Sequence, residues 1–213
     1  MSWDLESNKS SNSNKREFTK FPQGITRIIV LDKSPQARWT HFLLHHKRSI
    51  NCPGRACPIC EIRKQQKINK EPYTYAMGKR FSMNIYNLET GKIEIMEQGK
   101  EFFEQLRDLK DELENQNKEL NQTIIKVKRR GAGKDDTSYR LDVDTETNLP
   151  NLSEETLSKL TDLSVYFTPH SAEQVLRVIS GEKWEDVMVN KQNDANNKEE
   201  GTEEEIEEEI ELK

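Results

Sequence analysis

Short β-branched or alternating segments, separated by turn residues, predict most of the strands of this chain. Residues 25–31 (ITRIIVL) are rich in β-branched side chains and end at a polar turn that contains Pro35. Residues 81–87 and 92–96 alternate with period two around Leu88-Glu89-Thr90-Gly91, and this pattern predicts a β-hairpin. Residues 38–46 predict a further strand.

A helix and a second hairpin follow. Residues 101–115 carry apolar side chains at helical spacing, which predicts a helix whose stripe faces the core; the stripe is Phe102, Phe103, Leu106, Leu109 and Leu113. Residues 122–130 and 137–143 predict paired strands, with Lys126, Lys128 and Arg130 on one strand face. The fold class is therefore mainly β with accessory helices (α+β), and the element order is compatible with a small closed barrel of about five strands.

The remaining segments predict a helical extension and two unfolded ends. Residues 153–163 predict a helix with Ser153 as its N-cap, and residues 171–180 predict a second short helix. We expect Trp184 and Val187 to pack these helices back on the barrel. Only 32% of the chain is hydrophobic and 33% is charged, so part of it is expected to be unfolded. We assign 1–20 to a flexible polar and basic arm, 21–146 to the core, 147–190 to the helical extension and 191–213 to a disordered acidic tail.

The net charge of -5 combines a basic body with an acidic tail. Residues 15–145 hold 26 Lys and Arg against 18 Asp and Glu, an excess of eight positive charges. Residues 198–213 hold nine Glu and two Lys, an excess of seven negative charges. A basic body favours a polyanionic partner. No apolar run approaches the ~20 residues that a membrane helix needs, and no secretory signal is visible, which favours a reducing, cytosol-like compartment.

Residues 39–60 (WTHFLLHHKRSINCPGRACPIC) predict a metal site. They contain all three cysteines, Cys52, Cys57 and Cys60, with four and two residues between them. Two cysteines separated by two residues can present both sulfurs to one zinc ion in a tight turn. A fourth ligand must come from elsewhere, and His41 is the best candidate; His45 and His46 remain alternatives.

Other interpretations of the three cysteines fit the segment less well. A disulfide would leave one thiol over, and no strand–helix pattern typical of redox Cys-x-x-Cys proteins surrounds the pair. Burial as small apolar residues is disfavoured, because residues 52–60 also carry two prolines, a glycine and an arginine. Three thiolates and one imidazole fill a tetrahedral site, which is the structural pattern of zinc. No convincing catalytic set is present, so we expect a binding protein and not an enzyme.

Aromatic side chains on a basic barrel predict a single-strand binding surface, because bases stack on rings while cations follow the phosphates. The aromatic candidates are Trp39, Tyr73, Tyr75, Phe81, Tyr86 and Tyr139. The phosphate candidates are Arg27, Arg38, Lys47, Arg48, Arg55, Lys79, Arg80, Lys126, Lys128, Arg130 and Arg140. Core packing is the alternative for each ring, and a solvated surface is the alternative for each charge.

The segments ITRIIVL, WTH, CPGRACPIC, FSMNIYNLETGKIEIMEQG and IIKVKRRGAGKDDTSYRLDV resemble phage single-stranded-DNA-binding proteins, the family of the T-even phage helix-destabilising protein. The resemblance covers residues 24–144. It implies an OB-fold with an inserted zinc module whose ligands are His41, Cys52, Cys57 and Cys60. It also implies protection of single-stranded DNA during replication, recombination and repair, in the cytoplasm of an infected bacterium.

The same resemblance implies roles for the two ends of the chain. A basic N-terminal arm would support cooperative self-association on DNA, and an acidic C-terminal segment would recruit replication and recombination proteins. Two other interpretations stay open: a zinc-ribbon transcription or RNA-binding factor, and a protein–protein adaptor with a structural zinc module.

Overall fold

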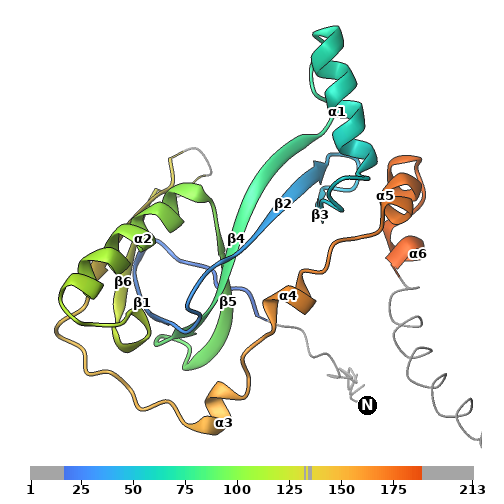
Figure 1. Ribbon diagram of the computed structural model, residues 1–213. Helices are drawn as coiled ribbons and strands as arrows, with labels where there is room; N and C mark the ends of the chain where they lie inside the picture. Colours follow the sequence, from blue (N-terminus) through green and yellow to red (C-terminus); the bar gives the residue numbers. More distant parts are fainter. Residues whose placement is uncertain (1–16, 132, 134–135, 189–213) are drawn as a thin grey trace, which may run out of the picture. The chain divides into compact units, whose positions relative to one another are not determined.

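The protein is a mixed α+β chain with one open, mainly antiparallel sheet. The computed structural model describes residues 17–131, 133 and 136–188 (Figure 1). Seven strands run in the order β3-β2-β4-β1-β6-β7, with β5 attached to β4. This path is open, so the closed barrel expected from the sequence is not seen among the described strands. Residues 1–16 of the predicted arm (1–20) and the predicted tail at 191–213 lie outside the described residues. Residues 17–20 are described, and they are not a free arm, because Phe18 forms a parallel bridge with Ile95 of the sheet and Thr19 is buried.

The chain divides into two compact units. The first unit contains the described residues among Met1–Ala37 and Arg80–Tyr166, and the second those among Arg38–Lys79 and Phe167–Lys213. The strands are β1 (Gly24–Val30), β2 (Gln36–Leu43), β3 (Arg48–Asn51), β4 (Ala76–Asn87), β5 (Lys92–Gln98), β6 (Ile125–Arg130) and β7 (Ser138–Val143). The helices are α1 (Pro58–Asn69), α2 (Lys100–Asn115), α3 (Glu154–Leu157), α4 (Leu163–Tyr166), α5 (Ala172–Ile179) and α6 (Trp184–Met188), with a 3-10 turn, η1, at Leu120–Gln122.

Helix α2 closes the core of the first unit (Figure 1). Its predicted apolar stripe is confirmed, since all five of its members are buried. They pack with Met83, Ile85 and Met96 of the β4–β5 hairpin and with Ile125 and Val127 of β6. Both predicted hairpins form, with Met83 opposite Met96 and Val127 opposite Leu141. Strand β1 pairs antiparallel with β4 and with β6.

The predicted helix at 153–163 is shorter than expected. Ser153 caps it as predicted, accepting a hydrogen bond from the Thr156 N–H, but α3 ends at Leu157. The Asp162 carboxylate accepts hydrogen bonds from the Ser164 and Val165 N–H groups, so it caps a separate helix, α4. Between the two helices, Thr161 exchanges two hydrogen bonds with the buried Asn84 amide, at 2.9 and 3.1 Å. These two bonds fix the segment that joins α3 to α4.

The second unit has its own core. Strands β2 and β3 form a short antiparallel pair in which His41 lies opposite Ile50. The strand predicted for 38–46 is interrupted, because β2 ends at Leu43 and Lys47 adopts a left-handed turn conformation (φ 50°) before β3 begins. Leu43, Ile50 and Ile59 pack with apolar side chains of α5 and α6. Helix α5 begins with a complete capping box formed by Ser171 and Gln174.

Trp184 and Val187 pack with side chains of the second unit, which include Leu43, Ile50 and Ile59 of the predicted core. Val187 is fully buried in the core of the second unit, with Val175 and Val178 of α5, and Trp184 packs against the same cluster. Their partners are the residues around the cysteines and not the strands of the first unit. Within the described ranges, none of the helices combines the length and the apolar composition that crossing a membrane requires.

Candidate metal centre

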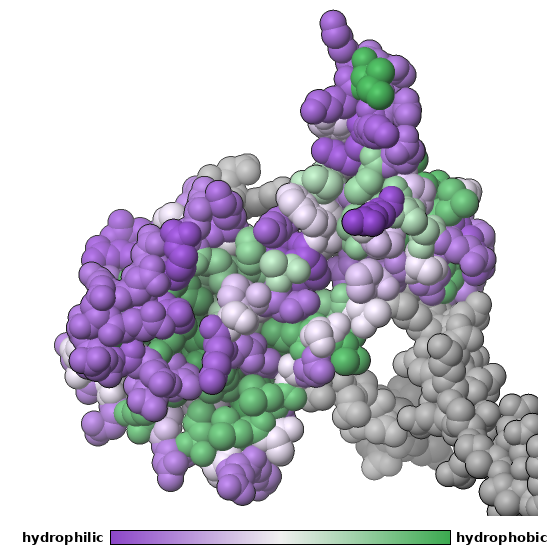
Figure 2. All heavy atoms as spheres, in the orientation of Figure 1, coloured by the Kyte–Doolittle hydropathy of each residue, from purple (hydrophilic) through white to green (hydrophobic). Residues whose placement is uncertain are grey.

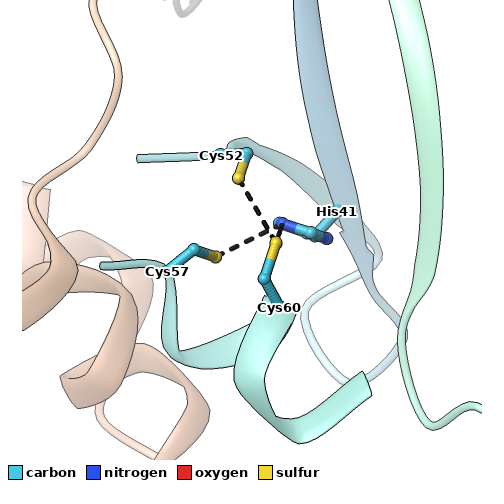
Figure 3. Close-up of side chains that lie close together, drawn as sticks. All are labelled: His41, Cys52, Cys57 and Cys60. Atoms are coloured by element: carbon cyan, nitrogen blue, oxygen red, sulfur yellow. Dashed lines mark hydrogen bonds between the residues drawn. The ribbon is translucent and has the colours of Figure 1, made fainter. Parts of the chain in front are cut away.

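Four side chains from three segments of the second unit converge on one point. His41 lies on β2, Cys52 follows β3, Cys57 is the N-cap of α1 and Cys60 lies in the first turn of that helix (Figure 3). The β2–β3 ladder continues through a hydrogen bond from the Cys52 N–H to the Trp39 carbonyl (2.8 Å), which brings Cys52 close to His41. The side chains of all four point toward one another.

The segment between the cysteines is built as a tight turn into a helix. Gly54 has φ 87°, a conformation that favours glycine, and its carbonyl accepts from the Cys57 N–H at 3.1 Å. Pro58 occupies the first position of α1, where its missing N–H costs no hydrogen bond. One helical turn then carries Cys60 to the same side as Cys57.

The distances between the ligand atoms match a tetrahedral zinc site. Cys52 Sγ and Cys60 Sγ are 3.6 Å apart, and His41 Nε2 lies 3.3 Å from Cys57 Sγ and 3.5 Å from Cys60 Sγ. All four ligand atoms lie within 4.8 Å of one another. Zn–S bonds of about 2.3 Å and Zn–N bonds of about 2.0–2.1 Å place tetrahedral ligands roughly 3.6–3.8 Å apart. The arrangement can hold a metal ion, and its donor set suits zinc.

Without a metal ion, the surroundings of the four residues favour neutral thiols and a neutral imidazole. All three cysteines are free, so no disulfide accounts for their proximity. Burial raises the pKa of the Cys57 thiol and raises the pKa of the Cys60 thiol to about 12. Burial and the nearby Arg63 guanidinium lower the pKa of His41, which keeps the imidazole neutral. A metal ion replaces the thiol protons when it binds.

The structure distinguishes between the three candidate histidines. His41 is fully buried, and Nε2 is the ring nitrogen that faces the sulfurs. The other ring nitrogen, Nδ1, has no hydrogen-bond partner among the described residues. His45 is exposed, and His46 Nε2 lies 3.3 Å from the carbonyl of Val178 on α5. Neither belongs to the group of four.

Five of the six predicted phosphate contacts of the first unit lie on one face of β1, β6 and β7, and the sixth, Arg80, lies on β4. In the strand register Arg27 lies opposite Lys126, and Lys128 lies opposite Arg140. The opposite face of these strands carries Ile28, Ile125, Val127 and Leu141 into the core. We call the outward-facing set Arg27, Lys126, Lys128, Arg130 and Arg140 the basic wall.

Part of the basic wall is engaged in internal ion pairs. The Arg27 Nε donates to the buried Asp144 carboxylate at 2.8 Å, and Lys126 Nζ lies 3.8 Å from the same group. Hydrogen bonds from the Glu146 N–H and from Arg27 hold the pKa of Asp144 below its usual range. Lys128 and Arg130 form no ion pair with any described residue, so their charges remain available to a ligand.

Two of the candidates in the second unit are held by local contacts. The Arg38 guanidinium lies 3.4 Å from the centre of the Phe167 ring, and its Nε donates to Asn51. Arg48 pairs with Glu185 on α6 at 3.4 Å and faces the Trp184 ring.

The remaining candidates differ in exposure. Trp39 is 48% exposed, and the Lys79 ammonium lies 5.8 Å from its ring centre. Lys47 is exposed at its turn, and Tyr75 is partly buried against the core of the second unit. In the first unit Tyr86 is partly buried, and Arg80 is exposed and lies 3.9 Å from Glu97.

Tyr139 is better explained by packing than by base stacking. Its ring contacts the rings of Phe21 and Phe102 in the core of the first unit, with centroids 6.0 and 5.5 Å away. It shares a strand face with Leu141, which is buried. The most exposed of the predicted rings are Tyr73 (50%) and Trp39 (48%), and the Arg63 guanidinium lies 3.9 Å from the centre of the Tyr73 ring.

Sequence reasoning missed Asp144 and Phe167. Asp144 also accepts hydrogen bonds from the Thr147 N–H and hydroxyl, a turn pattern that Asp and Thr spaced in this way often form. That spacing was visible in the sequence, but the pairing with Arg27, 117 residues away, was not. Nothing in the sequence indicated that Phe167 would stack with Arg38.

No protein-family model matches the chain, and no curated protein matches it in sequence.

Proposed function

We propose that the chain binds single-stranded DNA without strong sequence preference, as a non-enzymatic protein with a structural zinc ion. The observation that carries the proposal is the basic wall: five cationic side chains on three adjacent strands, of which Lys128 and Arg130 are free of internal ion pairs with described residues. A strip of cations spaced by a β-ladder suits the regularly spaced phosphates of a nucleic-acid strand.

The strand order supports an OB-fold within the first unit. Three antiparallel strands that are adjacent in the sheet, β1, β4 and β5, are followed in the chain by α2 and then by the β6–β7 hairpin, whose first strand pairs back with β1. This is a five-stranded arrangement in which an approach of β5 to β7 would complete a barrel. That closure is part of the proposal.

The zinc ion would act by holding the second unit together. A tetrahedral site filled by three thiolates and one imidazole leaves no open position for substrate, which is typical of structural zinc. Its ligands would join β2, the end of β3 and α1, and the three cysteines pack in one cluster with side chains of α5 and α6. The exposed Trp39 on this unit is the ring that we assign to base stacking.

The roles proposed for the ends of the chain follow from the family resemblance, and their composition agrees with it. Nine glutamates at 198–213 suit the recruitment of replication and recombination proteins, and the basic residues of the N-terminal arm suit self-association on DNA. Function in the cytoplasm of an infected bacterial host is part of the same proposal.

A competition experiment tests the proposal. A labelled oligothymidylate bound at low salt is challenged with unlabelled single-stranded DNA, duplex DNA and RNA of equal length. We expect single-stranded DNA to compete best, and charge reversal of Lys128 and Arg130 to glutamate to weaken binding more than the matched reversal of Lys64, an exposed lysine on α1. Preference for duplex DNA or for RNA would instead favour a zinc-ribbon transcription or RNA-binding factor.

A further inference from the structure

The first unit has an apolar hollow beside helix α2. Its volume is about 400 Å³, within the range that small ligands and side chains occupy. Its apolar lining comes from three elements of this unit: Phe81 and Met83 of β4, Phe103 and Leu106 of α2, and Leu120 of η1. In Figure 2, hydrophobic surface is visible beside the mostly hydrophilic helix α2.

The border of this hollow is cationic. Lys33, Lys100, Arg107 and Lys110 line it, against the single acid Glu104. Lys33 forms no ion pair with a described residue. The other three bases pair with acids on the surface of α2, at 2.8–3.1 Å. Such exposed pairs contribute little to stability, so an acidic ligand can exchange with them.

The chain itself contains a segment of complementary chemistry. Residues 203–212 read EEEIEEEIEL, in which Ile206, Ile210 and Leu212 are the only apolar side chains among glutamates. Ile206 and Ile210 are separated by three glutamates and have further glutamates on both sides. Apolar anchors within an acidic segment match an apolar hollow within a basic border.

We propose that the hollow beside α2 is a docking site for the acidic segment 203–212, with Ile206 and Ile210 entering it and the flanking glutamates meeting Lys33, Arg107 and Lys110. The segment comes from the same chain or from a second copy, and the contacts are the same in both cases. This surface is separate from the basic wall, which lies on β1, β6 and β7. The docking site does not depend on DNA binding.

Site-specific photocrosslinking in the full chain tests this assignment. Ile210 is replaced by p-benzoylphenylalanine, the purified protein is irradiated at low salt, and the crosslinked peptides are identified by mass spectrometry. We expect crosslinks to 81–83 and 100–120. Crosslinks within one chain or between two copies both support the site, provided that they fall on these residues.

Charge reversal at the border of the hollow tests the electrostatic part of the docking. Lys33→Glu combined with Arg107→Glu is expected to lower the crosslink yield about fivefold, since two exposed attractive pairs become repulsive. Both residues are exposed, so thermal unfolding of the variant should match that of the parent protein. Lys64→Glu on α1 is the matched control and should leave the yield unchanged. Crosslinks confined to β6–β7 or to the second unit, no crosslinks at all, or a yield that the double reversal leaves intact would overturn the proposal.

Discussion

Replacing Cys57 with serine removes one of the four candidate metal ligands at a buried position of the second unit. Cys57 is 2% exposed, its sulfur lies 3.3 Å from His41 Nε2, and it packs in the same cluster as Ile50, Ile59 and Val178. The change therefore weakens the metal site and introduces a hydroxyl into an apolar environment. Both effects destabilise the folded second unit.

The size of the loss follows from two contributions. A ligand that binds only the folded state raises the free energy of unfolding in proportion to the logarithm of its affinity. A hundredfold weaker affinity for zinc therefore lowers the free energy of unfolding by about 2.7 kcal/mol. A buried hydroxyl without a partner costs about 1–3 kcal/mol more. We expect the free energy of unfolding of the second unit to fall by roughly 4–6 kcal/mol in the presence of zinc.

Scanning calorimetry together with metal analysis measures this effect. The parent protein should contain one zinc per chain, and the Cys57→Ser variant should contain less and unfold at a lower temperature. His45→Ala is the matched control, because His45 is exposed and lies outside the group of four. If the Cys57→Ser variant kept one zinc per chain and the transition temperature of the parent, the four-residue centre would be wrong.

Three further predictions concern stability and stacking. Leu113→Ala truncates a side chain of α2 that is 2% exposed, so urea unfolding should show a loss of about 2–5 kcal/mol. Folding lowers the pKa of Asp144, so its carboxylate stabilises the protein above its unfolded pKa of about 3.9 and this contribution is lost as the pH falls toward the folded value. Asp144→Asn should therefore lower the melting temperature at pH 7, with a difference from the parent that shrinks below about pH 4; an equal difference at both pH values would contradict this reasoning. Trp39→Ala should weaken oligothymidylate binding by about 1–3 kcal/mol without altering thermal unfolding, and unchanged affinity would exclude stacking on this ring.

Local sequence patterns were sufficient to predict much of the secondary structure of the first unit. The stripe on α2 has a helical period, and the two hairpins alternate with a period of two around turn residues, so each element could be recognised from its own segment. The grouping of Cys57 and Cys60 was equally local, because two intervening residues and Pro58 fix the turn. His41 and Cys52 could be added because β2 and β3 are neighbours along the chain.

Contacts between distant segments could not be predicted in the same way. The pairing of Arg27 with Asp144 spans 117 residues, and it engages a cation that the sequence presented as a phosphate contact. Val187 is apolar and follows a short helix, but nothing in its segment identifies the cysteine-bearing unit as its partner. Alternation along a strand indicates on which face of the sheet a side chain lies. It does not identify the segment of the chain that packs against that face.

The most direct test of the account is the salt dependence of oligothymidylate binding by the zinc-loaded full chain. Tryptophan fluorescence is titrated with the oligonucleotide at several salt concentrations, and the logarithm of the binding constant is plotted against the logarithm of the salt concentration. We predict a straight line whose slope is about −0.7 for each phosphate neutralised, so that two contacts, from Lys128 and Arg130, already give about −1.4. Absence of binding in dilute buffer, or an affinity that salt leaves unchanged, would contradict the account.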